Sequence, residues 1–215
     1  MKNIAILGTG MVGDTLGTKL VSLGHKVKMG SRTANNEKAT AWVVRNGDLA
    51  SCGTFADAAA FGEIIFNCTT GTNSLEALQL AGRENLQGKI LVDVANPLDF
   101  SKGMPPSLSV CNTDSLGEAI QRQFTDVKVV KTLNTLNCQL MVNPGALKDP
   151  GNVFICGNDA DAKIEIEGLL KSFGWKKIID LGDISAARGT EQVLPIWVRL
   201  MGKLGTAMFN FSIVQ

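Results

Sequence analysis

The sequence predicts a three-layer α/β fold, in which a mostly parallel β-sheet lies between two layers of helices. Short apolar segments alternate along the chain with longer segments whose apolar residues recur at helical spacing, and this order is typical of parallel sheets covered on both faces. No internal repeat or low-complexity linker divides the 215 residues, and one core can organise a chain of this length. We therefore expect one domain with a short helical C-terminal extension at 184–215.

Seven segments are expected to form the strands, because they are short, apolar and rich in β-branched residues. They lie near residues 3–8, 26–30, 63–68, 89–95, 127–132, 152–157 and 176–181. Helices are expected near residues 11–23, 36–46, 55–61, 73–81, 113–123, 134–142, 159–173 and 184–204. The segment 98–112 is rich in proline and serine, so a long loop is expected at the carboxyl end of the fourth strand, where open α/β sheets bind ligands.

The C-terminal segment 193–213 carries an apolar stripe at helical spacing. Its members are Leu194, Trp197, Leu200, Met201, Leu204, Met208, Phe209 and Phe211. Such a stripe favours core packing or a homodimer interface, and it would also suit a cover over the ring system of a second ligand, because small-molecule sites are mostly apolar. Arg188 and Glu191 stand three residues apart at the start of this helix, so a local ion pair is expected between them.

The composition gives no reason to expect a nucleic acid, an acidic membrane or a metal ion as a partner. The formal net charge is +1, so any anion must be recognised by a local arrangement of residues. The five cysteines form no CxxC pair and there is one histidine, which argues against a disulfide framework or a metal site and for reduced thiols in the cytosol. Neither a leader-like segment nor a long apolar run is present, so a cytoplasmic protein without a membrane span is expected.

A glycine-rich turn of the pattern GxGxxG follows the first strand. Its residues are Gly8, Thr9, Gly10, Met11, Val12 and Gly13. In this context the first glycine permits a tight turn, the second lets a pyrophosphate approach the backbone, and the third allows close packing of helix on strand. The N-terminus of the following helix offers free N–H groups and a partial positive charge to the phosphates. The turn predicts a Rossmann-type NAD(P)-binding domain over residues 1–183.

The end of the second strand indicates which dinucleotide is bound. NAD-selective domains carry an acidic residue there, which accepts hydrogen bonds from the adenosine ribose. Here the strand runs into Gly30, Ser31 and Arg32. The guanidinium offers charge and a planar set of donors to a 2′-phosphate, which a carboxylate would repel. Ser31 can add a hydroxyl donor and Lys38 a second positive charge, so NADP(H) is expected in preference to NAD(H).

Five segments together resemble one family of NADPH-dependent oxidoreductases. They are GTGMVG at 8–13, GSR at 30–32, VDVANPL at 92–98, VVKTLNTLN at 129–137 and LGTAMFNFSIV at 204–214. The family is typified by the reduced-deazaflavin (coenzyme F420 type):NADP oxidoreductases of archaea and actinobacteria, and it includes the N-terminal domains of metalloreductases of the STEAP type. The resemblance covers essentially the whole chain. It implies one Rossmann domain, with NADP along the carboxyl edge of the sheet and a deazaflavin or flavin stacked near the nicotinamide.

The resemblance also implies which residues contact the cofactor. The pyrophosphate would lie against Thr9, Gly10, Met11 and Val12, and the 2′-phosphate against Ser31 and Arg32, with Lys38 as the nearest further basic residue. The remaining contacts would come from Thr69 and Thr70 beside the pyrophosphate and nicotinamide ribose, Asn96 and Pro97 facing the nicotinamide, and the backbone of Leu136, Asn137 and Cys138 at its carboxamide.

Few side chains at the expected site could donate or accept a proton. His25 belongs to a turn at the amino end of the sheet, away from the ligand edge. Lys131, at the end of the fifth strand, is the best-placed ionisable group and a weak catalytic candidate; it could equally be a surface charge or pair with Asp93 or Asp99. Reduction of a carbonyl usually needs a placed acid, whereas hydride transfer between NADPH and a deazaflavin or flavin ring mainly requires face-to-face positioning. The shortage of acid–base groups therefore favours a redox ring as the second substrate.

Three functions are compatible with these observations. The favoured one is an NADP(H)-dependent oxidoreductase that transfers hydride between the nicotinamide and a deazaflavin, a flavin or a similar small electron carrier. The second is an NADPH-dependent reductase of a small carbonyl or imine metabolite, related to pyrroline-5-carboxylate reductase; such enzymes normally add a larger helical domain. The third is a non-catalytic NADP sensor, against which the nicotinamide-side ANP motif at 95–97 argues.

Overall fold

The computed structural model describes all 215 residues, in which strands and helices alternate. The strands are β1 (Asn3–Leu7), β2 (Lys26–Ser31), β3 (Ala50–Thr54), β4 (Ile64–Asn67), β5 (Ile90–Asp93), β6 (Leu98–Asp99), β7 (Ser107–Leu108), β8 (Lys128–Thr132), β9 (Val153–Gly157) and β10 (Ile178–Asp180). The α-helices are α1 (Met11–Ser22), α2 (Glu37–Asn46), α3 (Phe55–Phe61), α4 (Ser74–Ala81), α5 (Arg83–Leu86), α6 (Leu116–Gln123), α7 (Cys138–Val142), α8 (Ala160–Phe173), α9 (Ala187–Gln192) and α10 (Leu194–Leu204). Short 3-10 helices lie at Gly47–Leu49 (η1), Gly71–Asn73 (η2), Pro144–Ala146 (η3) and Ile184–Ala186 (η4).

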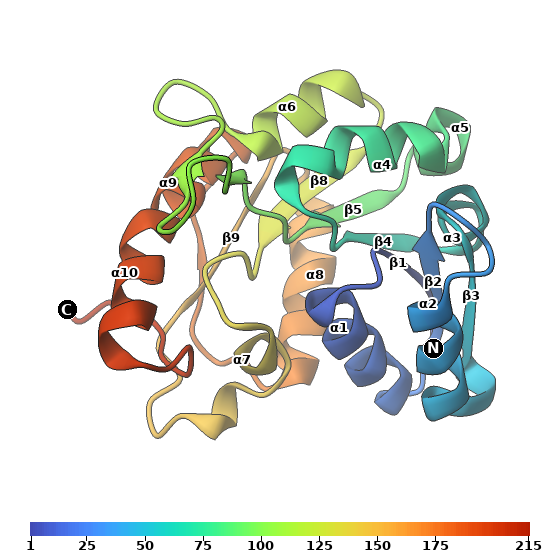
Figure 1. The fold of residues 1–215 in the computed structure, drawn as a ribbon, viewed down its shortest axis with the longest axis horizontal. Coiled ribbons are helices and arrows are strands. Elements are labelled where there is room, and N and C mark those ends of the chain that lie inside the picture. The colour runs from blue at the N-terminus through green and yellow to red at the C-terminus, as the bar shows by residue number, and fades with distance from the viewer.

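Eight of the strands form one sheet in the order β10–β9–β8–β5–β4–β1–β2–β3 (Figure 1). This is the strand order of a Rossmann fold, extended by two strands beyond β8. Neighbouring strands are parallel from β3 to β8, whereas β9 runs antiparallel to β8, and β10 is parallel to β9. The carboxyl ends of β1, β4, β5 and β8 therefore meet at one edge. The predicted mostly parallel α/β fold with a C-terminal helix is confirmed.

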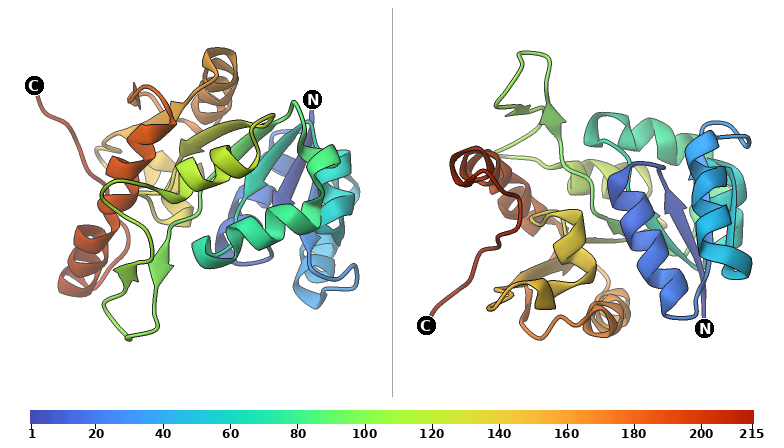
Figure 2. Two further views of the ribbon diagram at one scale, coloured as in Figure 1. Left: turned by 90° about the horizontal axis from the view of Figure 1, so that it is seen from above. Right: turned by 60° about the horizontal axis from the view of Figure 1, so that its bottom comes forward.

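Helices cover both faces of this sheet (Figures 1 and 2). On one face, α1, α2, α7 and α8 cover a cluster of 28 buried residues that includes Leu16, Trp42 and Ile166. On the other face, the helices α3 to α6, together with η4 and α9, cover a cluster of 20 buried residues that includes Leu7 and Ile120. In Figure 1, α10 stands at the opposite end of the molecule from α2 and β3.

The first βαβ unit positions the glycine-rich turn. β1 is buried along most of its length and is a continuous apolar run, as a central parallel strand should be. On α1 the buried face repeats at helical spacing through Gly13, Leu16, Gly17 and Leu20. Gly17 lets the ring of Trp42 approach closely, because a Cβ there would lie 2.8 Å from the ring atom Cζ2. These contacts hold the N-terminus of α1 at the carboxyl edge of the sheet.

Among the strands and α-helices, three features were not predicted, one of which is the one-turn helix α5. β3 lies at the edge of the sheet, paired with β2, and its residues ASCGT are too small and polar to form the apolar run that marks the other strands. The segment 98–112, predicted as a loop, contains the short antiparallel hairpin of β6 and β7. Leu98 pairs there with Leu108, so the segment has a defined course beside the sheet.

Two predicted helices are shorter than their patterns indicated. The helix predicted at 134–142 begins at residue 138, because Leu133 has a positive φ of 63° that ends regular structure after β8. Asn137 caps α7, its side chain accepting a hydrogen bond from the N–H of Gln139 at 2.9 Å. The helix predicted at 184–204 is divided into η4, α9 and α10, since Pro195 near the start of α10 has no N–H with which to continue the preceding helix.

The residues after α10 turn back onto the body of the protein. The side-chain amide of Asn210 donates to two carbonyl oxygens of the loop before β9, at 2.7 and 2.9 Å. Trp197 stacks on Phe209 with 5.2 Å between ring centroids, and Phe211 meets Phe209 edge-on at 6.4 Å. The apolar stripe is therefore partly intramolecular packing, while Ile196 on α10 is exposed; the homodimer through this helix stays a prediction. None of the helices combines the length and apolar character needed to cross a bilayer.

The predicted local pair between Arg188 and Glu191 is wrong. Arg188 forms its ion pair with Glu118 on α6, near the surface. Glu191 points into the protein and pairs with Lys131. The reason is that the two side chains leave α9 in different directions, one toward solvent and one toward a buried ammonium and the start of α6.

Candidate functional site

The turn between β1 and α1 has the geometry that a dinucleotide phosphate requires. Gly8 has a φ of +121°, which L-residues avoid, and a Cβ built on Gly13 would lie 2.2 Å from the Gly8 carbonyl oxygen. A Cβ on Gly10 would meet no atom within 4 Å, so the backbone there faces open space. No side chain caps the N-terminus of α1, and its first N–H groups are therefore free to meet an anion. The turn fits a pyrophosphate.

A cleft of about 280 Å³ lies beside this turn, between the end of β2 and the start of α4. We call it the adenosine-side cleft; Ser31, Arg32 and Glu76 are among the residues that line it. The buried hydroxyl of Ser31 donates to the carbonyl oxygen of Thr33 at 2.5 Å and so helps to fix the loop after β2. Arg32 is exposed and takes part in none of the ion pairs of the protein. Its guanidinium is therefore available to a phosphate.

The end of β2 leaves no room for a side chain before Ser31. A Cβ on Gly30 would lie 2.9 Å from the Cβ of Ala58 and 3.2 Å from the Cδ2 of Leu7. A carboxylate at Gly30 would thus require the neighbouring helix to move. The one carboxylate that lines the adenosine-side cleft, Glu76, comes from α4 on another wall.

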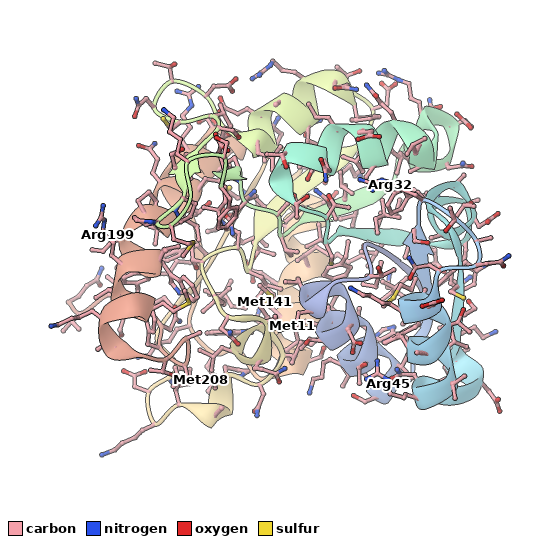
Figure 3. The ribbon with its side chains drawn as sticks, viewed as in Figure 1. Met11, Arg32, Arg45, Met141, Arg199 and Met208 are labelled. Carbon is pink, nitrogen blue, oxygen red and sulfur yellow. The ribbon has the colours of Figure 1, made fainter.

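Two predicted contacts lie outside this cleft. Met11 and Lys38 line a separate groove of about 490 Å³, together with Arg45. The groove shares Thr9 and Gly10 with the adenosine-side cleft, which Arg32 lines and Lys38 does not; the phosphate contacts of Met11 and Lys38 stay predictions. Figure 3 labels the two arginines: Arg32 lies near the end of β2, and Arg45 lies lower, beside α1.

A second cleft, of about 270 Å³, adjoins the first and shares Cys68, Thr69 and Thr70 with it. We call it the nicotinamide-side cleft; its walls include Val12 from α1, residues 94–96 after β5, and Phe100. None of its lining residues carries a carboxylate, imidazole, amine or guanidinium. Burial, and to a smaller degree Asp93, raises the pKa of the Cys68 thiol far above its ordinary value. The cleft therefore offers apolar walls and neutral hydrogen-bonding groups.

Two asparagines join the segments that follow β5 and β8 at this cleft. The amide of Asn96 donates to the carbonyl oxygen of Asn134 at 2.7 Å, and the amide of Asn134 donates back to Asn96 Oδ1 at 3.0 Å. Asn134 also donates to the carbonyl oxygen of Thr190 on α9, at 3.1 Å. Beyond Asn96, the carbonyl oxygen of Pro97 accepts from the N–H of Ser109 at 2.8 Å, which holds the hairpin against the site.

The sequence-predicted residues are thus only partly brought together. The two clefts are lined by Gly8, Thr9, Gly10, Val12, Ser31, Arg32, Thr69, Thr70 and Asn96. Gly13 packs against Gly8 and Pro97 against Gly71, so both lie behind these walls. Leu136 and Cys138, which flank Asn137 at the start of α7, are buried in the apolar cluster against which Val12 packs; their role at the carboxamide stays a prediction.

Lys131 lies beneath the clefts and lines neither of them. It is 1% exposed, and its ammonium contacts Asp93 Oδ2 at 2.7 Å, Glu191 Oε1 at 2.8 Å and the Ala95 carbonyl oxygen at 2.6 Å. Burial alone would lower the pKa of Lys131, but the two carboxylates outweigh burial and raise it, so the amine is charged at neutral pH. The pairing with Asp93 is confirmed, and the alternative of a surface charge is wrong because the end of β8 is covered by α9.

Asp99 and His25 line neither cleft. Asp99 is in the hairpin, where its carboxylate accepts from the N–H of Ser101 at 2.8 Å. His25 Nδ1 accepts from the N–H of Lys2 at 3.2 Å, near the start of β1. Burial, and then the charges of the N-terminus and Lys2, lower the pKa of His25. No group of three or more His, Cys, Asp or Glu side chains is placed to hold a metal ion.

Known proteins resemble this chain in both sequence and fold. Residues 3–97 match the family described as NADP oxidoreductase, coenzyme F420-dependent. The crystal structure of a proposed F420-dependent NADP reductase from Arthrobacter sp. FB24 is 52% identical to the chain, with a TM-score of 0.95 over 100% of both. The chain belongs to the F420-dependent NADP oxidoreductase family. The F420-dependent NADP reductase of Methanocaldococcus jannaschii is 27% identical over 207 residues, which make up 92% of this chain and 91% of that protein.

Other similar proteins are longer than the chain. Metalloreductase STEAP3 of Rattus norvegicus is 29% identical over 198 residues, which cover 90% of the chain but 37% of that protein. An imine reductase from Aspergillus terreus is 18% identical with a TM-score of 0.67, covering 95% of the chain and 62% of the reductase. The likeness to the imine reductase shows the fold alone.

The family description names NADP and F420 as ligands, and the residues present fit the first of them. Gly10 leaves an open cradle, α1 presents an uncapped N-terminus, and Arg32 is an unpaired cation beside both. Asn73 and Glu76 also line the adenosine-side cleft and were not predicted from the sequence. Their position just after β4, at the carboxyl edge, was the available signal.

Proposed function

We propose that the protein is an NADP(H)-dependent oxidoreductase that transfers hydride between the nicotinamide and a deazaflavin of the F420 type or a flavin. The observation that carries this proposal is the nicotinamide-side cleft. It opens directly from the adenosine-side cleft through Cys68, Thr69 and Thr70, and no charged side chain lines it. Apolar walls with a few neutral polar groups suit a flat ring system.

The cofactor would lie along the carboxyl edge of the sheet. The turn of Gly8 to Gly13 and the N-terminus of α1 would hold the pyrophosphate, and Arg32 would bind the 2′-phosphate through charge-assisted hydrogen bonds. Ser31 lies beside Arg32, but its one hydroxyl proton is donated to the carbonyl oxygen of Thr33, so it would join the phosphate contact only by giving up that bond. Asn96 uses one amide N–H on the carbonyl oxygen of Asn134, which leaves its second N–H for the nicotinamide carboxamide.

Such a hydride transfer requires few reactive groups from the protein. When bound, NADPH would supply a hydride to the central ring of the acceptor, at a carbon of a deazaflavin or a nitrogen of a flavin, and a solvent proton would complete the reduction, so that NADPH, the oxidised ring and one proton give NADP⁺ and the reduced ring. The protein's contribution is to hold two rings face to face and to exclude water. Val12, Leu98 and Phe100 supply apolar walls for this purpose.

The test is to follow the absorbance of NADPH with three kinds of acceptor: coenzyme F420, riboflavin or flavin mononucleotide, and a small imine or aldehyde. We expect NADPH to be consumed with a ring acceptor and not with the imine or aldehyde. A parallel reaction with NADH controls for cofactor choice. Turnover with the imine or aldehyde alone would contradict the proposal in favour of metabolite reduction, and tight NADPH binding without turnover would point to a sensor. The cytoplasmic location stays a prediction.

A further inference from the structure

A row of polar side chains crosses the sheet beneath the two clefts. Asn67, Asp93 and Lys131 are in register on β4, β5 and β8, with Asn67 paired to Asp93 and Asp93 to Lys131. In-register residues of parallel strands point to the same face of the sheet. Glu191 of α9 closes the row on Lys131 at 2.8 Å. All four residues are at most 1% exposed; we call them the polar row.

One end of the polar row orients Thr69, which lines both clefts. Asn67 Nδ2 donates to Asp93 Oδ1 at 2.9 Å and to Ser74 Oγ at 3.0 Å. Asn67 Oδ1 accepts from the hydroxyl of Thr69 at 2.7 Å and from its N–H at 3.3 Å. The rotamer of Thr69 is thus held from below.

The middle of the row holds the segment after β5. Asp93 Oδ1 accepts from the N–H of Ala95 at 3.2 Å, and the ammonium of Lys131 donates to the Ala95 carbonyl oxygen at 2.6 Å. Ala95 is part of the wall of the nicotinamide-side cleft and precedes Asn96. Both backbone polar groups of this wall residue are therefore bonded to the row.

The other end of the row connects to the helices that follow. Besides Lys131, the carboxylate of Glu191 accepts from the N–H groups of Leu116 at 2.9 Å and Gly117 at 3.1 Å, in the first turn of α6. Burying three charged groups costs desolvation energy that an apolar set of the same shape would not incur, so buried ion pairs are weak evidence for stability. The polar row forms hydrogen bonds to Thr69 and Ala95, two residues of the cleft walls. These bonds indicate that the row orients the walls rather than stabilising the fold.

We propose that the polar row positions the nicotinamide half of NADP(H), with Lys131 acting as a positioning residue through Ala95 and Asn67. Its three N–H groups already have three acceptors, so none is left to meet a substrate. The inference rests on the proposed function only in that NADP(H) lies along the carboxyl edge. The adenosine half would be held separately, by Arg32 and the glycine-rich turn, which line the adenosine-side cleft.

The test compares two ligands on the full chain. Adenosine 2′,5′-bisphosphate carries the adenosine half and the 2′-phosphate, whereas NADPH carries both halves. In Glu191→Gln we expect the Kd for NADPH to rise roughly tenfold, within the range of coupled contacts, and the Kd for the bisphosphate to stay unchanged. Glu118→Gln is the matched control, because it removes the other carboxylate between α6 and α9 without touching the polar row. We expect it to change neither Kd.

The outcomes separate the claims. Equal weakening of both ligands, no weakening in a folded Glu191→Gln variant, or the same effect in Glu118→Gln would overturn the positioning role. If Glu191→Gln does not fold, Ser74→Ala tests the other end of the row, because Ser74 Oγ contacts Asn67 and Thr69 without lining either cleft, and the same selective loss of NADPH is expected. Failure of the unmodified protein to bind NADPH would instead refute the proposed function.

Discussion

Arg188 and Glu118 form a two-point ion pair, with 2.8 Å between Nε and Oε2 and 2.5 Å between Nη2 and Oε1. The pair joins α9 to α6 across 70 residues of chain. The hydroxyl of Ser115 donates to the same carboxylate at 2.8 Å. Because both oxygens of Glu118 accept hydrogen bonds, the ionised form of this carboxyl group is favoured.

The ion pair predicts loss of stability in acid. The hydrogen bond from Arg188 lowers the pKa of Glu118 from its ordinary 4.5, against the opposing effect of burial. Because the folded-state pKa lies below the unfolded one, this contribution is present above pH 4.5 and is lost as the pH falls through the folded value. In urea unfolding at a series of pH values, Glu118→Gln should show a smaller fall in the free energy of unfolding below pH 4.5 than the unmodified protein. Identical curves would contradict the assignment.

The two glycines of the phosphate turn should fail in different ways. In Gly13→Ala the new Cβ must displace the Gly8 carbonyl, from which it would lie 2.2 Å, and we expect a loss of about 1–3 kcal/mol in unfolding free energy, as for other overpacked sites. In Gly10→Ala the new methyl meets no protein atom, so stability should be unchanged while NADPH binding weakens. Thermal unfolding and NADPH titration of both variants check this pair. Unchanged NADPH affinity in Gly10→Ala would show that the pyrophosphate does not bind at this turn.

Arg32 should decide between the two dinucleotides. Loss of a charge-assisted phosphate contact costs on the order of 1.5–3 kcal/mol, so Arg32→Ala should weaken NADPH by roughly 10- to 150-fold and NADH very little. Arg45→Ala is the matched control, since Arg45 already pairs with Asp14 at 2.5 Å outside the adenosine-side cleft. Calorimetric titration with both nucleotides measures the preference. An unchanged preference in Arg32→Ala would refute the assignment of the 2′-phosphate.

The sequence was sufficient for those parts of the fold that depend on local pattern. Strands with apolar runs and the turn of Gly8 to Gly13 were correctly placed, because burial on both faces and the lack of room for a Cβ leave direct marks on the sequence. The sequence ASCGT of β3 has no such pattern, because this segment is a strand only through its pairing with β2. The direction of β9 is likewise set by tertiary pairing.

The site was less predictable where it depends on contacts between distant segments. The place of Arg32 beside the phosphate turn could be predicted from its position after β2. The pairing of Glu191 with Lys131 could not, because the two residues are 60 positions apart and only the packing of α9 brings them together. Lys38 lines the neighbouring groove, which shares Thr9 and Gly10 with the adenosine-side cleft, so a phosphate contact from Lys38 stays a prediction. Periodicity specifies which residues share a helix face, but not which cleft that face borders.

Substitution of the aromatic cluster after α10 can distinguish whether this segment packs only against the protein or also covers the bound ligands. Phe209 lies between Trp197 and Phe211, and no residue after α10 lines either cleft. We expect Phe209→Ala to lower the unfolding free energy by about 1–3 kcal/mol, below the value for a fully buried aromatic because the ring is half-buried. Val214→Ala, at an 89% exposed position, is the control and should change nothing. The Kd for NADPH should stay constant in both variants; a rise in Phe209→Ala would show that the segment reaches the cofactor and would assign the apolar stripe to the site.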